Sequence, residues 1–276
     1  MRDKNNIVEL MSNYYENFYK NELGLPDWQE RIKLRLNEEE NYCSRFIDWF
    51  EDWFDYDFSG KKVLVVGCGT GGELVNFKNK GADIYGIEPN KNALTISHLK
   101  AAQSDIPKEN ITNGYSENLP YDENQFDFIY CYTVLEHVAD VEKSINEMVR
   151  CAKVKGKIFI ETPDYRQLYE GHYKLPLPMF LPIWMNKIIV RFFRRPSDFL
   201  DTINKVNSRQ LQRIFNKSSV TSFRVFKENK NKMPKIRFRL SFFVEIIQYT
   251  IHRFFGVSRN QIWVLHKSEI RKSKIL

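Results

Sequence analysis

Residues 63–88 read VLVVGCGTGGELVNFKNKGADIYGIE, and this stretch decides the fold of the chain. Val63–Val66 has the β-branched character of a buried strand, and a glycine-rich turn follows without a spacer. A helix-length stretch then leads to a second apolar run, residues 84–87, which ends at Glu88. This order predicts a β-α-β unit with a glycine-rich first turn.

The turn and the acid after it indicate a site for a nucleoside-type cofactor. Glycines permit a tight turn and let backbone N–H groups approach a ligand closely. Glu88 can accept hydrogen bonds from the hydroxyls of a ribose. Gly67, Gly69 and Gly72 also fit the pyrophosphate-binding pattern G-x-G-x-x-G, so the turn alone leaves a nicotinamide or flavin cofactor open. No G-x-x-x-x-G-K-[ST] pattern occurs, which excludes a P-loop.

Three later segments narrow the choice of cofactor. They are G-x-S-E-x-L-P at 114–120, F-D-x-I at 126–129 and L-E-H-V at 135–138. Together with the GCGTG turn and the acid closing the second strand, they resemble the class I S-adenosylmethionine-dependent methyltransferases over about residues 60–165. The resemblance implies S-adenosylmethionine as the cofactor and an antiparallel last strand.

The expected cofactor-binding residues follow from the parts of S-adenosylmethionine, which has a ribose, an adenine and a zwitterionic tail but no phosphate. The family often has Asp at the position of Tyr115, to bond the adenine amino group. Here backbone groups or Ser116 must do so, or the ring of Tyr115 stacks on the base. The full expected set is Gly67, Cys68, Gly69, Gly71, Glu88, Pro89, Tyr115, Ser116, Glu117 and Cys131.

The rest of the chain reads as α/β, with mostly alternating helices and seven strands in a doubly wound, Rossmann-like sheet. Helices are expected at 7–22, 28–55, 72–80, 91–103 and 140–152, with Ser208 capping a further one, and late strands at 156–160, 220–226 and 261–265. The expected division is an N-terminal helical segment or lid (1–58), the cofactor-binding core (59–164), an inserted helical cap (165–206), and C-terminal core strands (207–276) with a basic amphipathic insert near 227–260.

Two histidines are candidates for the chemistry, because an alcohol acceptor benefits from a general base. His137 follows the fourth strand, and His172 lies in the cap between Glu170 and Tyr173. Either can take a hydroxyl proton at neutral pH. The alternatives are a structural histidine that orients the loop under the cofactor, for His137, and a surface loop residue, for His172. The five histidines and four cysteines show no metal-ligand spacing, so no metal is expected.

The charge is divided unevenly along the chain. Residues 1–138 carry 14 Lys and Arg against 24 Asp and Glu, whereas residues 139–276 carry 28 against 11. The basic half indicates an anionic partner or a solvated lysine-rich surface. The apolar face at 240–255 leaves three alternatives open: packing on the cap, a subunit contact in a homodimer, or peripheral contact with a membrane.

The sequence shows no signal peptide, no C-x-x-C pair and no stretch of 18 uncharged apolar residues, which predicts a cytoplasmic enzyme. The basic half, with the apolar stretches at 185–195 and 240–255, predicts that it visits the inner face of the membrane. The predicted reaction is O-methylation of a small or carrier-linked sugar or glycan, as in bacterial surface polysaccharide biosynthesis. An RNA methyltransferase is the alternative, although the sequence contains no recognisable RNA-binding motif and nucleic acid is not the expected partner. An NAD-dependent oxidoreductase and an inactive scaffold are further alternatives.

Overall fold

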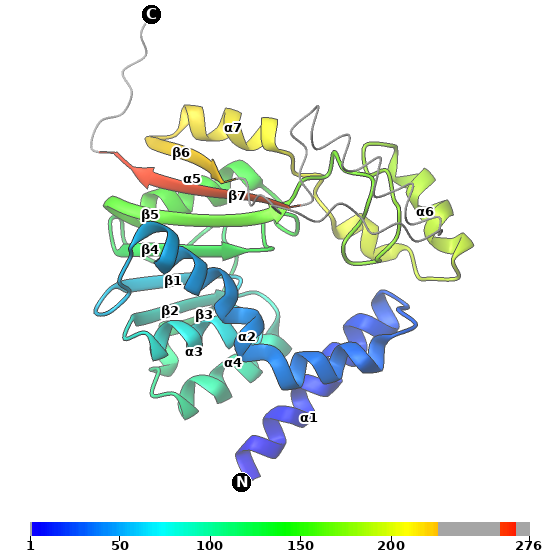
Figure 1. The fold of residues 1–276 in the computed structure, drawn as a ribbon, viewed down its shortest axis with the longest axis horizontal. Helices are drawn as coiled ribbons and strands as arrows, with labels where there is room; N and C mark the ends of the chain where they lie inside the picture. The colour runs from blue at the N-terminus through cyan, green and yellow to red at the C-terminus, as the bar shows by residue number, and fades with distance from the viewer. Residues whose placement is uncertain (1, 226–259, 269–276) are drawn as a thin grey trace, which may run out of the picture.

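A computed structural model describes residues 2–225 and 260–268 of the chain (Figure 1). Within these residues lies a seven-stranded sheet in the order β3-β2-β1-β4-β5-β7-β6. Strands β1 to β5 pair in parallel, and β7 is antiparallel to both β5 and β6. This confirms the doubly wound α/β sheet and its antiparallel last strand. The strands are β1 (Lys62–Val66), β2 (Asp83–Glu88), β3 (Ile111–Asn113), β4 (Phe126–Tyr132), β5 (Ala152–Pro163), β6 (Val220–Val225) and β7 (Asn260–Lys267).

The helices of the described residues largely follow the sequence pattern. They are α1 (Arg2–Glu16), a π-helix η1 (Asn17–Glu22), α2 (Trp28–Phe54), α3 (Gly72–Asn79), α4 (Lys91–Gln103), α5 (Val141–Cys151), α6 (Ile183–Phe192), α7 (Ser208–Lys217) and the short 3-10 helices η2 (Lys108–Asn110) and η3 (Asp198–Thr202). One helix start differs from the prediction. Asn207, not Ser208, caps α7: its backbone is extended, and its side-chain oxygen accepts from the N–H of Gln210.

The central strands are buried on both faces, as parallel strands covered by helices are. Alternate side chains of β1 therefore enter different cores. Val63 and Val65 pack with Phe50 of α2 and Phe77 of α3. Leu64 and Val66 pack in the opposite core, which contains Ile145 and Met148 of α5 and Leu211 and Phe215 of α7. The two layers of helices fix the sheet, and with it the carboxyl ends of β1, β2, β4 and β5.

The N-terminal segment and the insert after β5 share a third core, which we call the cap cluster. It consists of Leu23, Leu25, Tyr165, Tyr173, Leu175, Leu177, Met179, Val190, Leu200 and Ile203. Figure 1 shows the insert, including α6, beyond the carboxyl ends of β4 and β5. The function of this region as an acceptor-selecting cap stays a prediction.

The expected amphipathic insert at 227–260, with its basic residues and its apolar face at 240–255, lies outside the described residues except for Asn260. Among the helices of residues 2–225 and 260–268, none has both the length and the apolar character to cross a bilayer.

Candidate active site

The glycine-rich turn joins β1 to α3, and three of its glycines have left-handed backbone angles. The φ values are +67° at Gly67, +53° at Gly69 and +85° at Gly71. A Cβ at Gly67 would lie 2.5 Å from Val134, and one at Gly71 would lie 3.0 Å from Ser97. A Cβ at Gly69 would meet nothing within 4 Å. The first and third glycines are thus required by packing, whereas the middle one faces open space that fits a ligand.

Glu88 ends β2 directly beside this turn. One carboxylate oxygen accepts from the N–H of Gly69 and the other from the N–H of Asn90, each at 2.8 Å. Each oxygen keeps a second lone pair, so the pair can receive the two hydroxyls of a ribose. Burial raises the pKa of Glu88, and burial followed by the charge of Glu88 raises the pKa of Tyr14 in α1 to about 12. The open space at Gly69 and the acceptor oxygens of Glu88 fit S-adenosylmethionine.

Of the three residues expected at the adenine, Tyr115 is exposed, whereas the side chains of Ser116 and Glu117 form hydrogen bonds within the protein. The ring of Tyr115 is 66% exposed, so it is available for stacking. The hydroxyl of Ser116 lies 2.9 Å from that of Ser144, and a carboxylate oxygen of Glu117 accepts from the N–H of Ala139 at 2.7 Å. Ser116 and Glu117 therefore hold the loop before α5, and their contact with adenine stays a prediction.

Cys68, Pro89 and Cys131 offer backbone groups rather than reactive side chains. The side chains of Cys68 and Cys131 are buried in the two cores. The carbonyl of Pro89 accepts from the side-chain amide of Asn113 at 3.1 Å. Any contact of the two cysteines with a cofactor must therefore pass through the main chain.

Helices α1 and α2 are tied to the glycine turn by a chain of polar contacts that the sequence did not reveal. The hydroxyl of Tyr15 lies 3.2 Å from that of Thr70, which donates to Glu39 of α2 at 3.0 Å. Lys100 of α4 donates to the same carboxylate at 2.6 Å. The turn is thus in contact with the N-terminal segment, whose role as a lid stays a prediction.

The two candidate histidines meet, although 34 residues separate them in the chain. His137 follows β4, His172 belongs to the insert after β5, and their ring centroids are 5.3 Å apart. The ring of Phe199 lies 5.1 Å from His172 and 5.8 Å from His137. His172 Nδ1 lies 2.7 Å from Glu170, whose other oxygen accepts from the N–H of Tyr173.

Glu136 is fully buried beside these histidines, and Glu161, also fully buried, interacts with Glu136. One oxygen of Glu136 accepts from the hydroxyl of Thr162 at 3.0 Å, and the other has no hydrogen-bond partner among the described residues. Glu161 accepts from the side-chain amide of Asn260, and its second oxygen also lacks a partner there. The L-E-H-V segment displayed Glu136, but no local signal showed that it points toward His172.

Burial sets the ionisation of this group. Desolvation raises the pKa of Glu136 to about 7, and desolvation with the charge of Glu136 raises that of Glu161 to about 8. The rings around His137 desolvate it and, with His172 nearby, lower its pKa to about 4. Desolvation opposes a charge on His172, but the bond to Glu170 outweighs it, so the pKa of His172 is raised.

The other histidines lie elsewhere. His98 Nε2 is 2.9 Å from the carbonyl oxygen of Ile111, His266 packs on Phe223 in the sheet, and His252 is outside the described residues.

Known proteins resemble this arrangement in sequence and in fold. Residues 64–160 match the family model described as "Methyltransferase domain". A demethylmenaquinone methyltransferase of Geobacillus sp. is 29% identical over 49% of this chain and 63% of its own length. A ubiquinone biosynthesis O-methyltransferase of Klebsiella pneumoniae is 31% identical over 37% and 43%, respectively. The chain thus spans under two thirds of these relatives.

Solved structures share the fold. The YcgJ protein of Bacillus subtilis has a TM-score of 0.51 at 17% identity, covering 77% of this chain and 94% of its own. An S-adenosylmethionine-dependent methyltransferase of Mesorhizobium loti has a TM-score of 0.51 at 12% identity, covering 77% and 93%. Residues 64–160 therefore match a methyltransferase domain, and the described residues share the fold of S-adenosylmethionine-dependent methyltransferases. These similarities agree with S-adenosylmethionine as the expected cofactor.

Proposed function

We propose that the protein is an O-methyltransferase that acts on a hydroxyl group. In this reaction the bond from the sulfonium to its methyl carbon breaks, and the thioether keeps the electron pair. A bond forms from the acceptor oxygen to the methyl carbon, and the hydroxyl proton is released. The sulfonium already activates the methyl group, so the protein mainly aligns the acceptor and excludes water.

The observation that carries this proposal is the position of the histidine pair. His137 follows β4, which pairs with β1, and β1 leads into the glycine turn. Carboxyl ends of neighbouring parallel strands lie at one edge of a sheet, where open α/β folds bind their ligands. This position supports a role for His137 and His172 beside the proposed cofactor site, where Nε2 of His172 is not used by Glu170.

For the acceptor we propose a hydroxyl carried on a lipid. The two relatives are a demethylmenaquinone methyltransferase and a ubiquinone biosynthesis O-methyltransferase, and the second of these names specifies transfer to oxygen. The insert that contains the cap cluster lies at the same end of the sheet and is rich in apolar residues. A quinol-type ring is the first candidate that these names favour. The glycan on a lipid carrier, which the sequence suggested, stays a prediction.

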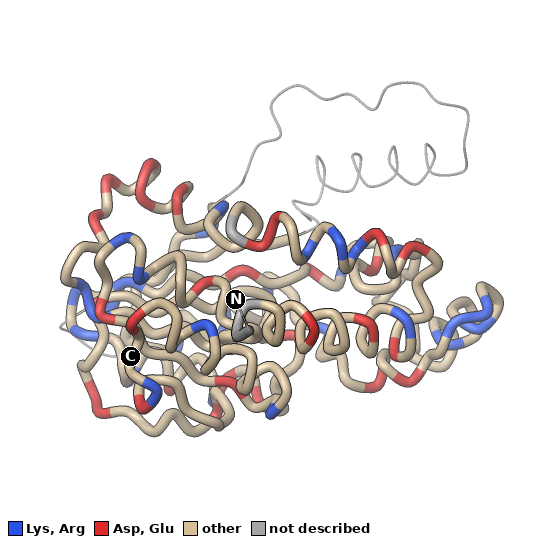
Figure 2. Tube along the Cα trace, turned by 90° about the horizontal axis from the view of Figure 1, so that it is seen from below, with Lys and Arg blue, Asp and Glu red and all other residues tan. Residues whose placement is uncertain are grey.

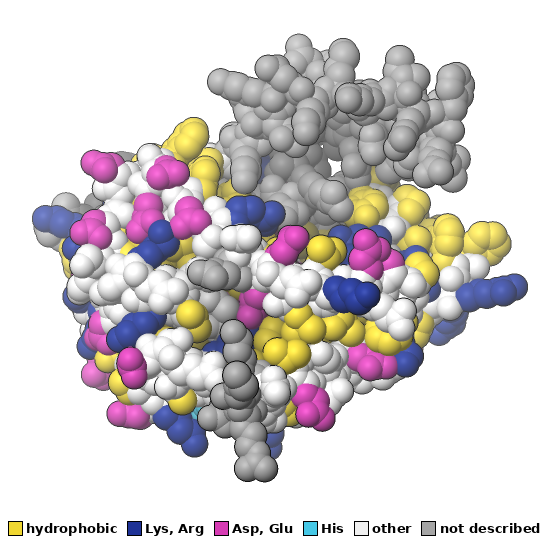
Figure 3. Space-filling model, turned by 60° about the horizontal axis from the view of Figure 1, so that its bottom comes forward, with side chains coloured by type: hydrophobic (Ala, Val, Ile, Leu, Met, Phe, Trp, Pro, Cys, Tyr) yellow, Lys and Arg dark blue, Asp and Glu magenta, His cyan; other side chains and the backbone are white. Residues whose placement is uncertain are grey.

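Helix α6 supports contact with a membrane surface. Trp184, Ile188 and Phe192 recur at helical spacing and are 60%, 57% and 81% exposed. Figure 2 shows Lys and Arg gathered at the tip that α6 forms, and Figure 3 shows apolar side chains at the same tip. Aromatic side chains with basic neighbours are typical of helices that lie in a membrane interface. We propose that this tip docks the enzyme on anionic lipid.

A transfer assay tests the proposed function. The purified chain is expected to bind S-adenosylmethionine and its demethylated product in calorimetry, and to bind neither NAD nor FAD. Labelled methyl should then move to a catechol-type quinol analogue with an isoprenoid tail. Transfer to RNA instead would establish the alternative, and tight NAD binding without sulfonium binding would refute the methyltransferase function.

A further inference from the structure

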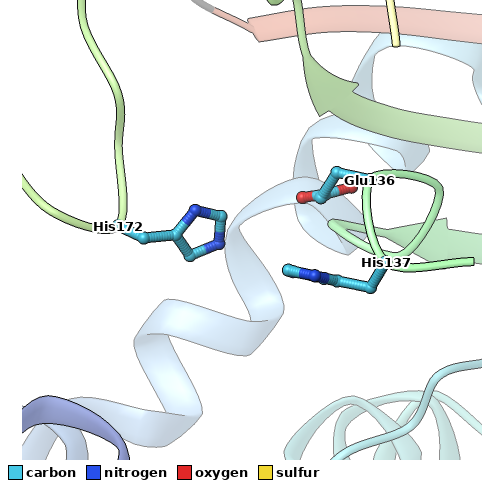
Figure 4. A group of neighbouring side chains, drawn as sticks. All are labelled: Glu136, His137 and His172. Carbon is cyan, nitrogen blue, oxygen red and sulfur yellow. The ribbon is translucent and has the colours of Figure 1, made fainter. Parts of the chain in front are cut away.

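Three side chains at the acceptor edge converge on one point. Glu136 and His137 come from the loop after β4, and His172 comes from the insert (Figure 4). Each offers one ligand atom, and these atoms all lie within 4.8 Å of one another. We propose that Glu136, His137 and His172 bind a divalent first-row transition-metal ion, of which Zn²⁺ is the probe.

The distances suit an ion after small movements. Ligand bonds of about 2.0–2.2 Å place tetrahedral ligands about 3.3–3.5 Å apart. Closing the site therefore needs side-chain rotations on the order of 1 Å. His137 is on the exposed side of the group, so its ring can rotate toward the other two. That exposed side also leaves a coordination position that an acceptor can reach.

The state of Glu136 is an independent sign of a missing ligand. Its side chain is fully buried, and one carboxylate oxygen has no hydrogen-bond partner among the described residues. Buried polar atoms without partners are rare and costly. Figure 4 shows the carboxylate directed toward His172 and His137. A cation between these groups would satisfy the free oxygen.

Glu170 holds His172 in the form that a metal needs. The carboxylate lies 2.7 Å from His172 Nδ1 and is itself fixed by the N–H of Tyr173. The proton on Nδ1 leaves Nε2 as the acceptor, and Figure 4 shows the far side of the ring facing Glu136 and His137. A carboxylate behind a ligating histidine is the usual orienting partner in metal sites.

The donor atoms select the class of ion. Two imidazole nitrogens and one carboxylate oxygen suit Zn²⁺ or Fe²⁺, whereas Mg²⁺ and Ca²⁺ prefer oxygen ligands alone. Two histidines and one glutamate also form a catalytic type of zinc site, with the fourth position open. The expectation of no metal came from sequence spacing, which cannot show that residues 136, 137 and 172 meet.

The catalytic role of the ion rests on the proposed function, methyl transfer to a hydroxyl. The binding of the ion does not depend on that function. A hydroxyl that is held by a divalent ion has a lowered pKa, so its oxygen becomes a better methyl acceptor. The ion would then replace a general base, and the hydroxyl proton would pass to solvent. His137 and His172 would act as ligands.

The test is a metal titration of the full chain. After dialysis against a chelator and then against chelator-free buffer, Zn²⁺ uptake is measured by calorimetry and Co²⁺ uptake by visible absorption. We expect one ion per chain. His172→Gln and Glu136→Gln should each weaken binding at least tenfold, and Glu170→Gln, which removes only the orienting group, about 10–100-fold.

His266→Gln is the matched control, since it removes a histidine remote from the group and should bind the ion as the parent does. Melting temperatures and S-adenosylmethionine affinity show whether each variant is folded, and His137→Gln on the exposed side serves where a buried change fails to fold. No uptake by the parent, or equal uptake by His172→Gln and His266→Gln, would overturn the metal site. If the chain binds the cofactor and transfers methyl but takes up no ion, the metal site is wrong and the proposed function is retained. If the chain binds the ion but transfers no methyl to a hydroxyl, the metal site is retained and the proposed function is rejected.

Discussion

The cofactor end and the acceptor end of the sheet edge are built in different ways. The cofactor end is one continuous stretch, from Gly67 to Glu88, and the carboxylate there is already bound by two backbone N–H groups. The acceptor end is assembled from residues 136–137, 170–172 and 199. It contains a buried carboxylate of which one oxygen has no partner among the described residues.

This difference shows which part of the site depends on local backbone structure and which part depends on tertiary packing. Local turn chemistry prepares the cofactor end before any ligand arrives. The acceptor end depends on tertiary packing and keeps polar groups that only a further ligand can satisfy. Changes to the ligand-facing groups of the cofactor end should therefore be seen mainly in binding, whereas changes at the acceptor end should be seen mainly in stability.

The largest expected effect is at Gly69. Gly69→Val should lower the affinity for S-adenosylmethionine beyond detection, because the branched side chain would fill the open space before the turn. Gly60 is a matched control: it also has positive φ, at +66°, and open space around a Cβ. Both valine variants carry the same backbone strain, so both should lose similar thermal stability while only Gly69→Val loses cofactor binding in calorimetry. Normal cofactor binding by Gly69→Val would show that the zwitterionic tail of S-adenosylmethionine does not lie beside Gly69.

At Glu88 a smaller loss is expected. Glu88→Ala removes charge-assisted bonds to the ribose and should weaken cofactor binding by about 1.5–3 kcal/mol. Glu109→Ala makes the same charge change at an exposed site and should leave calorimetric affinity unaltered. An unchanged affinity in Glu88→Ala would mean that another group receives the ribose.

The pH dependence of binding sharpens this result. Burial raises the pKa of Glu88, so in the free protein it takes up a proton at a higher pH than an exposed carboxylate does. Only the ionised form offers both oxygens as acceptors, so affinity should fall as the pH drops toward this raised pKa. Calorimetry across mildly acidic pH should show the fall in the parent and its absence in Glu88→Gln. A parallel fall in both would assign the dependence to a different group.

On the acceptor side, Glu161→Gln should make the protein more stable. The pKa of Glu161 is about 8 in the folded chain and about 4.3 in the unfolded chain. Between these values the folded chain holds a proton that the unfolded chain has lost, so the free energy of unfolding decreases as the pH rises. At about pH 8 the glutamine variant should gain about 1–3 kcal/mol, and at about pH 4 it should gain nothing.

Urea unfolding with a chelator present measures this difference. If Glu161→Gln is less stable than the parent at both pH values, Glu161 stabilises the fold and its ionised form does not destabilise the folded chain.

The smallest effect is expected at Trp184. Trp184→Ala should change the free energy of unfolding by less than about 0.5 kcal/mol, as exposed substitutions do, yet it should reduce flotation with anionic liposomes several-fold. Trp53, which is 65% exposed on α2, gives the control variant Trp53→Ala. High salt should lower flotation of the parent as well. Equal flotation of both variants would remove α6 from membrane contact.

Particular residues show how far the sequence could lead. The glycine turn, Glu88 and the class of sheet follow from local spacing and from the family motifs, and the structure confirms a seven-stranded sheet with an antiparallel last strand. The meeting of His137 with His172 was not predictable, because it depends on how the proline-containing insert, with its Phe199, packs on the loop after β4. Asn207 took the capping position expected of Ser208, because two adjacent residues can both cap and only the backbone decides.

The cap cluster also bears on how acceptor preference can change during evolution. Leu23 and Leu25 precede the glycine turn in sequence, yet they complete the apolar core of an insert that starts after β5. A chimaera that exchanges residues 165–206 alone would bring a new insert against an old N-terminal segment. If the insert selects the acceptor, as predicted, a new specificity would require the two segments to change together, although the sheet between them need not change at all.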